Sequence, residues 1–143
     1  MTLFKADVLL VEDSAAEARL AQEAFRETQF PVRIHTASDG VQALEFLRRQ
    51  GLYRDAPRPH LVLLDLNLPR KDGREVLQDI KADDDLRSIP VVILTTSQAQ
   101  SDIRCAYESY ANCYIQKPLE LDGFIEVVRS IQRYWLQMAE LPL

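Results

Sequence analysis

The chain has 143 residues and a formal net charge of -5, a length that fits one domain with a sizeable core and leaves no room for a second. Its Lys and Arg residues are scattered rather than clustered, so direct nucleic-acid binding is not expected. Apolar stretches stay near strand length, no signal-peptide pattern stands at the N-terminus, and two cysteines are too few for the disulfide framework of a secreted domain. We therefore expect a cytoplasmic protein without membrane attachment, with residues 1–143 forming one domain and a C-terminal extension at about residues 134–143.

Short apolar segments at regular spacing predict five strands. Four of them, at residues 8–11, 61–64, 91–94 and 113–116, are continuous apolar runs, which is the pattern of strands covered by helices on both faces. The segment at residues 32–37 instead alternates apolar and polar side chains, as a strand nearer a sheet edge does.

Helical spacing of apolar residues fills the intervals between these strands. Ser14 can cap the first helix, and Ser38 or Asp39 can cap the second. The predicted helices cover about residues 15–28, 41–47, 73–83, 98–110 and 119–138. Alternating strands and helices imply an α/β fold, with a doubly wound five-stranded parallel sheet that carries helices on both faces.

Polar side chains follow four of the predicted strands. Glu12 and Asp13 follow the first, Asp65 follows the run at 61–64, Thr95 follows 91–94, and Lys117 follows 113–116. Parallel strands end at one edge of a sheet, where ligands bind, so these groups should converge. Three carboxylates a few ångströms apart repel one another unless a cation sits among them, and oxygen ligands beside a phosphate suit Mg²⁺. The simplest chemistry is Mg²⁺-assisted phosphoryl transfer.

Each residue of this predicted site has a specific role in such chemistry. Asp65 is the candidate nucleophile, because an ionised carboxylate can attack phosphorus and form an acyl phosphate. Lys117 can offset charge on phosphate oxygens, and Thr95 can donate its hydroxyl. Asn67 lies in a turn, where its backbone carbonyl is a suitable Mg²⁺ ligand. Simpler interpretations stay open here, namely a turn or capping aspartate at 65 and a surface lysine at 117.

Two other kinds of site find little support in the sequence. Neither Gly-rich phosphate-loop pattern occurs among the four glycines, so a nucleotide is not an expected ligand. The second kind is a catalytic Ser-His-Asp arrangement. It has no histidine at the proposed site, because neither His35 nor His60 follows a predicted strand there.

Five sequence features at the strand ends form one pattern. They are Val11-Glu12-Asp13, Leu64-Asp65-Leu66-Asn67-Leu68-Pro69, Asp72-Gly73, Thr95 and Lys117-Pro118. Together they resemble the receiver domain of two-component response regulators, and the resemblance runs essentially from end to end of the chain. It implies the flavodoxin-like (βα)5 fold with strand order 2-1-3-4-5.

The resemblance also implies roles for the site residues. Asp65 would accept a phosphoryl group from a histidine kinase. Mg²⁺ would be held by Asp13, Asp65 and the Asn67 backbone carbonyl, with Glu12 helping through water. The chain would be a signalling protein rather than an enzyme, catalysing only its own phosphorylation and dephosphorylation.

A switch is part of the same resemblance. Thr95 and Tyr114 would move on phosphorylation and reshape the face made by the fourth helix, the fifth strand and the fifth helix. The Lys117–Pro118 bond would be cis, as in similar receivers.

A narrower resemblance concerns the partner. Residues 67–77, 89–97, 112–114 and 135–136 are similar to the small stand-alone regulators paired with bacterial phytochromes. This resemblance implies a phytochrome-type histidine kinase as the source of the phosphoryl group.

Apolar residues near the end of the chain predict an interface. Tyr134, Trp135 and Leu136 continue beyond the helix length needed to cover one sheet, and exposed apolar patches of this kind usually mark association. We expect a two-fold symmetric homodimer. Its predicted interface residues are Tyr107, Tyr110, Phe124, Val128, Tyr134, Trp135 and Leu136. The alternative is that Trp135 folds back over the sheet edge.

Two other classes of function compete with the phosphorylated regulator. A Mg²⁺-dependent phosphatase of the haloacid dehalogenase type also uses a strand-end aspartate, but its second acid should stand where this chain has Asn67, and its cap domain is missing. The second competing class is an interaction module that works without phosphorylation, and the complete set of Asp65, Thr95 and Lys117 argues against it.

Overall fold

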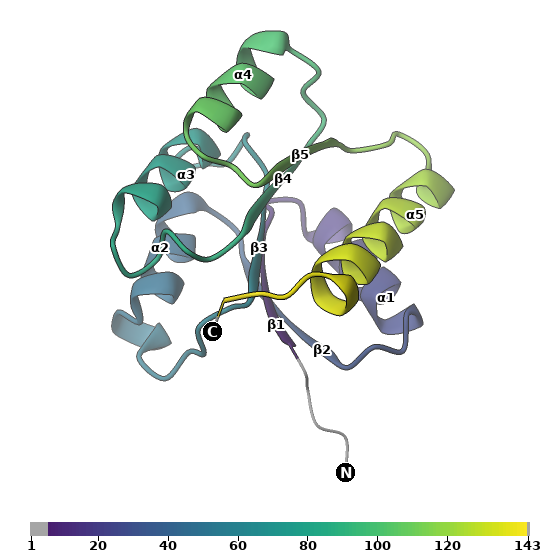
Figure 1. Cartoon of the computed structure of the whole chain (residues 1–143), viewed down its shortest axis with the longest axis horizontal. Helices are drawn as coiled ribbons and strands as arrows, with labels where there is room; N and C mark the ends of the chain where they lie inside the picture. Colours follow the sequence, from purple (N-terminus) through teal and green to yellow (C-terminus); the bar gives the residue numbers. More distant parts are fainter. Residues whose placement is uncertain (1–5, 143) are drawn as a thin grey trace.

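The computed structural model describes residues 6–142, in which strands and helices alternate along the chain (Figure 1). The strands are β1 (Ala6–Val11), β2 (Val32–Ala37), β3 (Leu61–Leu64), β4 (Val91–Thr95) and β5 (Cys113–Gln116). The helices are α1 (Ala15–Glu27), α2 (Gly40–Arg48), α3 (Gly73–Ala82), α4 (Gln100–Glu108) and α5 (Leu121–Ile131), with a short turn η1 (Gly51–Tyr53) and a final wide helix η2 (Gln132–Met138). No helix within residues 6–142 is long and apolar enough to cross a membrane.

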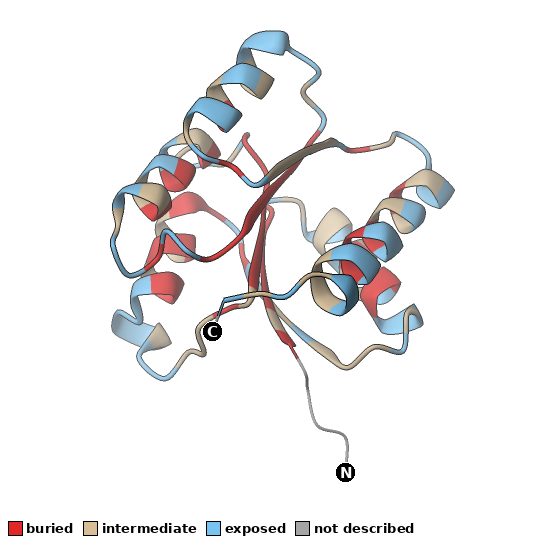
Figure 2. Cartoon of the chain, viewed as in Figure 1, coloured by how far each residue is buried: buried red, intermediate tan, exposed pale blue. Residues whose placement is uncertain are grey.

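The five strands form one parallel sheet in the order β2-β1-β3-β4-β5, which confirms the predicted fold class and strand order. Figure 1 shows α1 and α5 together on one face of the sheet and α2, α3 and α4 on the other. Figure 2 shows buried residues along the central strands and on the helix faces turned toward them.

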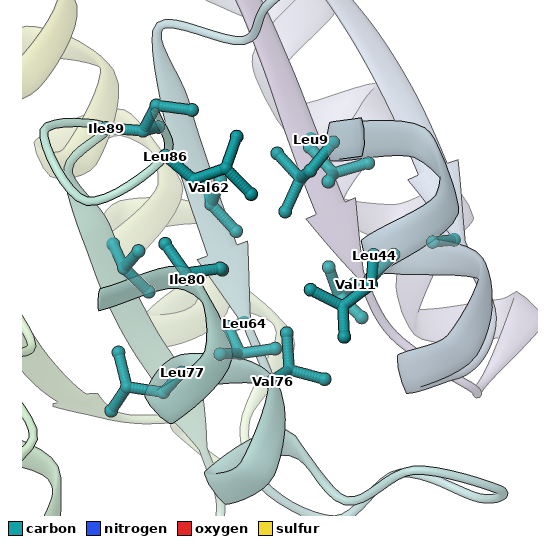
Figure 3. Packing of buried hydrophobic residues seen from close by; sticks show 14 of the residues in the cluster. Leu9, Val11, Leu44, Val62, Leu64, Val76, Leu77, Ile80, Leu86 and Ile89 are labelled. Carbon is teal, nitrogen blue, oxygen red and sulfur yellow. The ribbon is translucent and has the colours of Figure 1, made fainter. Parts of the chain in front are cut away.

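Successive residues of each central strand pack on opposite faces. Leu9 and Val11 of β1 join the cluster under α2, α3 and α4, whereas Val8 and Leu10 join the cluster under α1 and α5. Figure 3 shows the first of these clusters, in which Leu9, Val11, Val62 and Leu64 of the sheet meet side chains of α2 and α3. Both faces of the central strands are therefore buried, which explains their continuous apolar sequences.

The first two helices begin where the sequence predicts. The Ser14 hydroxyl accepts a hydrogen bond from the Glu17 backbone N–H at 3.2 Å. Asp39 caps α2 by accepting from the Gln42 N–H at 2.8 Å. These caps place the starts of both helices beside the carboxyl edge of the sheet.

The last predicted helix differs from the one observed. Residues 119–138 were expected to form one helix, but α5 ends at Ile131 and η2 continues it with the wider hydrogen bonding of a π-helix. The bond from the Ala139 N–H to the Tyr134 carbonyl, five residues back, is part of that geometry. Apolar spacing detects a helix but not this change of winding. The Lys117–Pro118 bond is trans, since residues 6–142 contain no cis peptide bond, so the expected cis bond is wrong; trans is the commoner form of X–Pro bonds.

Candidate functional site

Backbone hydrogen bonds of the sheet extend one residue beyond several strands and fix the predicted site residues at its carboxyl edge. The N–H of Glu12 donates to the Ala37 carbonyl at 3.0 Å, and the N–H of Asp65 donates to the Val11 carbonyl at 3.1 Å. The N–H of Lys117 donates to the Thr95 carbonyl at 2.7 Å. The side chains at these positions therefore stand on the rigid end of the sheet.

Three carboxylates come together there. Glu12, Asp13 and Asp65 each offer an oxygen atom within 4.8 Å of the others. Glu12 and Asp65 are only 6% and 8% exposed, while Asp13 faces solvent. Oxygen-only ligands of this charge suit a hard divalent cation, so the donor set fits such an ion.

Lys117 is the cation that faces two of these acids. Its ammonium donates to Glu12 and, at 2.9 Å, to Asp65 Oδ2, and it is itself buried. Glu17, in the first turn of α1, lies 3.5 Å from the same ammonium. Sequence reasoning missed Glu17 because it follows no strand; its place three residues after the capping Ser14 was the available signal.

Burial and pairing shift the pKa values of this pair in a defined direction. Burial outweighs the bond from Lys117 and raises the pKa of Glu12 above its usual range. Burial alone would lower the pKa of Lys117, but the hydrogen bonds and charges of Glu12 and Asp65 outweigh it and raise that pKa. Lys117 therefore stays a charged donor at neutral pH, as a phosphate-binding group requires.

Thr95 offers a hydroxyl that is ready for a further partner. It is fully buried at the end of β4, and its Oγ1 has no hydrogen-bond partner among the described residues. A buried hydroxyl without a partner is costly, so a ligand that accepted a hydrogen bond from it would be stabilised there.

The loop after Asp65 folds back over the acid group. The Asn67 N–H donates to Asp65 Oδ1 at 3.2 Å, so Asn67 stays next to the carboxylate. Gly73, the first residue of α3, packs so closely that an added Cβ would lie 2.1 Å from the Asp65 carbonyl oxygen. Only glycine fits there, which explains the Asp72-Gly73 pair in physical terms.

Tyr114, the other predicted switch residue, is half-buried on β5. Its ring packs against the cluster under α2, α3 and α4, and its hydroxyl donates to the Ser97 carbonyl at 3.0 Å. It therefore contacts the loop that follows Thr95.

The predicted interface residues separate into three groups. Phe124 and Val128 are buried in the core between α5 and the sheet, so assigning them to an interface was wrong; both lie on the apolar face of α5 that covers the sheet. The hydroxyl-bearing side chains Tyr107, Tyr110 and Tyr134 are 50%, 75% and 54% exposed.

Trp135 and Leu136 are intermediate. Both pack partly against the cluster under α1 and α5, and the Trp135 ring meets that of Tyr134 edge to face, with centroids 5.2 Å apart. Trp135 also lines a hollow of about 370 Å³ beside Cys113 and Ile115 of the edge strand β5. The alternative of Trp135 folding back toward the sheet edge is thus partly correct.

Comparisons with known proteins agree with this fold. The model of the response regulator receiver domain matches residues 8–129. The response regulator Rcp1 of Synechocystis sp. is 47% identical over 135 residues, which cover 94% of this chain and 92% of Rcp1. The probable methanogenesis regulatory protein FilR2 of Methanothrix harundinacea is 47% identical over 136 residues, covering 94% of this chain and 86% of FilR2.

Solved structures give the same result. The phosphorylated cyanobacterial phytochrome response regulator RcpA has a TM-score of 0.94 at 46% identity, covering 96% of this chain and 99% of that one. The Mn²⁺-bound form of Rcp1 has a TM-score of 0.93 at 46% identity, with the same coverage. A match over this much of the chain, on this fold, makes the protein a member of the response regulator receiver family.

Proposed function

We propose that this protein is a response regulator that accepts a phosphoryl group from a histidine kinase on Asp65 in a Mg²⁺-dependent reaction. The observation that carries the proposal is the setting of Asp65: a buried carboxylate bonded to Lys117, with two further carboxylates within 4.8 Å. The unpartnered Thr95 hydroxyl adds a donor at the same sheet edge. Membership of the receiver family favours this function over an aspartate-nucleophile phosphatase.

The chemistry needs few groups. A carboxylate oxygen of Asp65 forms a bond to phosphorus, the bond from phosphorus to the kinase histidine nitrogen breaks, and its electron pair leaves with the imidazole. Glu12, Asp13, Asp65 and the Asn67 carbonyl would hold Mg²⁺, which supplies positive charge for the phosphoryl oxygens. Lys117 supplies a second positive charge, and Thr95 donates its hydroxyl to a phosphoryl oxygen.

Phosphorylation then reaches the surface through Thr95 and Tyr114. The Thr95 hydroxyl gains its missing partner when the phosphoryl group arrives, and the Thr95–Ala99 loop follows it. Tyr114 bonds to that loop at Ser97, so its ring responds. The face formed by α4, β5 and α5 changes shape as a result.

A phytochrome-type kinase is the partner we propose. The support is the similarity to RcpA, a cyanobacterial phytochrome response regulator. We also propose a cytoplasmic homodimer in which Tyr107, Tyr110 and Tyr134 meet a second copy, because these large side chains are half-exposed or more.

The phosphorylation proposal is tested with acetyl phosphate as the donor. Intact-mass measurement should show one added phosphoryl group with Mg²⁺, none after chelation and none in the Asp65→Asn variant. Asp84→Asn, a change at a 92%-exposed carboxylate, is the matched control and should be labelled like the parent. Persistent labelling of Asp65→Asn would overturn the assignment.

The partner proposals need separate measurements. Phosphotransfer from a phytochrome kinase should be faster than from other histidine kinases; equal or faster transfer from the latter would overturn the proposal of a phytochrome-type partner. Sedimentation at micromolar concentration should show a dimer that Tyr110→Ser weakens, whereas a strict monomer with and without phosphorylation would rule the dimer out.

A further inference from the structure

A chain of polar contacts links the start of α3 to the loop between β4 and α4. Arg74, the second residue of α3, donates through Nε to Asp102 Oδ1 at 3.1 Å, in the first turn of α4, and its Nη2 lies 2.9 Å from the same oxygen in an ion pair. The other oxygen of Asp102 accepts from the Ser97 hydroxyl at 2.6 Å. Ser97 in turn accepts from the Tyr114 hydroxyl through its carbonyl, at 3.0 Å.

The α3 end of this chain is fixed. Arg74 Nη1 also donates to Asp72, at 3.1 Å and 3.2 Å to its two oxygens, and Asp72 caps α3 by accepting from the Arg74 N–H at 3.1 Å. Gly73, between them, packs directly on the carbonyl of Asp65. Arg74 is thus held on the element that contacts the backbone of the proposed phosphoacceptor.

The other end of this chain of contacts is Ser97, in the loop between β4 and α4. No side chain caps α4 at Ala99, and the Ser97 hydroxyl accepts the Ala99 N–H at 3.3 Å. Ser97 is two residues from Thr95, so a movement of Thr95 displaces the loop that contains Ser97. The Ser97 hydroxyl in that loop is bonded to Asp102. The hydrogen bonds from Ser97 and Arg74 hold the pKa of Asp102 below its usual range, so it remains a charged acceptor at neutral pH.

We propose that Arg74 and Asp102 are positioning residues for the switch: they hold Ser97 in place and so determine how strongly phosphorylation of Asp65 is coupled to Tyr114. This inference rests on the proposed function for its phosphorylated state. In the unphosphorylated protein the Tyr114 hydroxyl bond also depends on where Ser97 lies, so a change at Arg74 should move Tyr114 without phosphorylation.

The test uses the protein labelled with 3-fluorotyrosine, with the Tyr114 resonance assigned from Tyr114→Phe. In Arg74→Met the unphosphorylated Tyr114 resonance should move toward that of the exposed Tyr110. The shift induced by acetyl phosphate and Mg²⁺ should shrink by about threefold to tenfold, while the phosphorylated fraction, read by intact mass, stays close to that of the parent. Ser97→Ala, which removes one hydroxyl, should act in the same direction.

Two controls separate positioning from general loss of structure. Arg87→Met breaks the surface pair with Asp84, at 3.2 Å, and should leave Tyr114 unchanged. Arg74→Met combined with Asp102→Asn should change Tyr114 no further than either single variant, since the pair acts as a unit.

The outcomes distinguish this inference from the function on which it rests. If the parent is phosphorylated on Asp65 but Arg74→Met and Ser97→Ala keep the parent's Tyr114 resonance and response, the positioning role is overturned. If the parent is not phosphorylated, the proposed function fails, while a moved Tyr114 resonance in unphosphorylated Arg74→Met still supports the contact chain.

Discussion

The amino and carboxyl ends of the parallel strands, here called the amino and carboxyl edges of the sheet, both carry polar side chains. The two edges differ in how those side chains are paired. At the amino edge, Asp7 Oδ1 meets Arg33 Nε at 2.7 Å and His35 Nε2 at 2.9 Å, and the Asp7 N–H donates to His60 Nδ1 at 3.0 Å. Lys81 in the same region donates to two backbone carbonyls and to a side-chain amide oxygen.

At the carboxyl edge the pairing is incomplete. Three carboxylates cluster there, one ammonium of the described residues bonds to two of them, and the Thr95 hydroxyl has no described partner. Buried groups that lack partners cost stability, and burial raises the pKa of Glu12 despite its bond to Lys117, with a smaller contribution from the charge of Asp65. This difference is the one expected if the amino edge serves stability and the carboxyl edge binds the cation and the phosphoryl group that we propose.

The largest effect is expected from Lys117→Met without divalent cations. It leaves Glu12 and Asp65 buried without a counter-charge and should lower the free energy of unfolding by about 3 kcal/mol. Saturating Mg²⁺ should recover roughly half of that loss, because the cation binds the folded state. Urea titrations with and without Mg²⁺ measure both effects.

Lys81→Met is the matched control for this result. Lys81 is also a partly buried lysine with several acceptors, but it lies at the other edge. The decrease in the free energy of unfolding that Lys81→Met causes should be the same with and without Mg²⁺. Equal recovery in both variants would show that Mg²⁺ acts on the whole protein and not at the carboxyl edge.

A smaller effect, with a defined pH dependence, is expected at the amino edge. Burial alone would raise the pKa of Asp7, but hydrogen bonds and charges from Arg33 and His35 outweigh burial and lower that pKa from its ordinary 3.8. A lowered pKa in the folded state contributes stability that is present above the unfolded value and is lost as the pH falls through the folded one. Asp7→Asn should therefore cost about 1 kcal/mol at neutral pH.

The pH series sharpens this prediction. The unfolding free energies of the parent and Asp7→Asn should converge as the pH falls from 3.8 through the lowered folded-state pKa of Asp7, below which its carboxyl is protonated in both states. A gap that persists at the lowest pH would mean that Asp7 acts through packing and not through its charge.

Much of the carboxyl edge could be predicted from the sequence because it depends on strand ends. Continuous apolar runs locate the strands, and the parallel arrangement brings the residues that follow them together, as Glu12, Asp13 and Asp65 show. The caps at Ser14 and Asp39 were also predictable, because each capping side chain bonds to a backbone N–H only three residues later in the sequence.

Other features depend on contacts without a sequence period. Arg74, Ser97 and Asp102 are far apart or irregularly spaced along the chain, and only the packed fold brings them together. The exposure of Phe124 was predicted wrongly because one apolar stripe can cover a sheet or a partner, and its spacing is the same in both cases.

The smallest effect, and one of opposite sign, is expected at Thr95. Thr95→Val removes a buried hydroxyl that has no described partner while keeping the branched shape, so it should raise the free energy of unfolding by about 0.5 kcal/mol in the unphosphorylated protein. The same variant should still be phosphorylated on Asp65, yet its Tyr114 fluorotyrosine resonance should no longer respond, because the group that follows the phosphoryl oxygen is gone. Urea denaturation and the ¹⁹F spectrum measure the two effects on one sample. A clear loss of stability would mean that the hydroxyl already has a partner in the resting protein, and the contrast between the two edges would then not hold at Thr95.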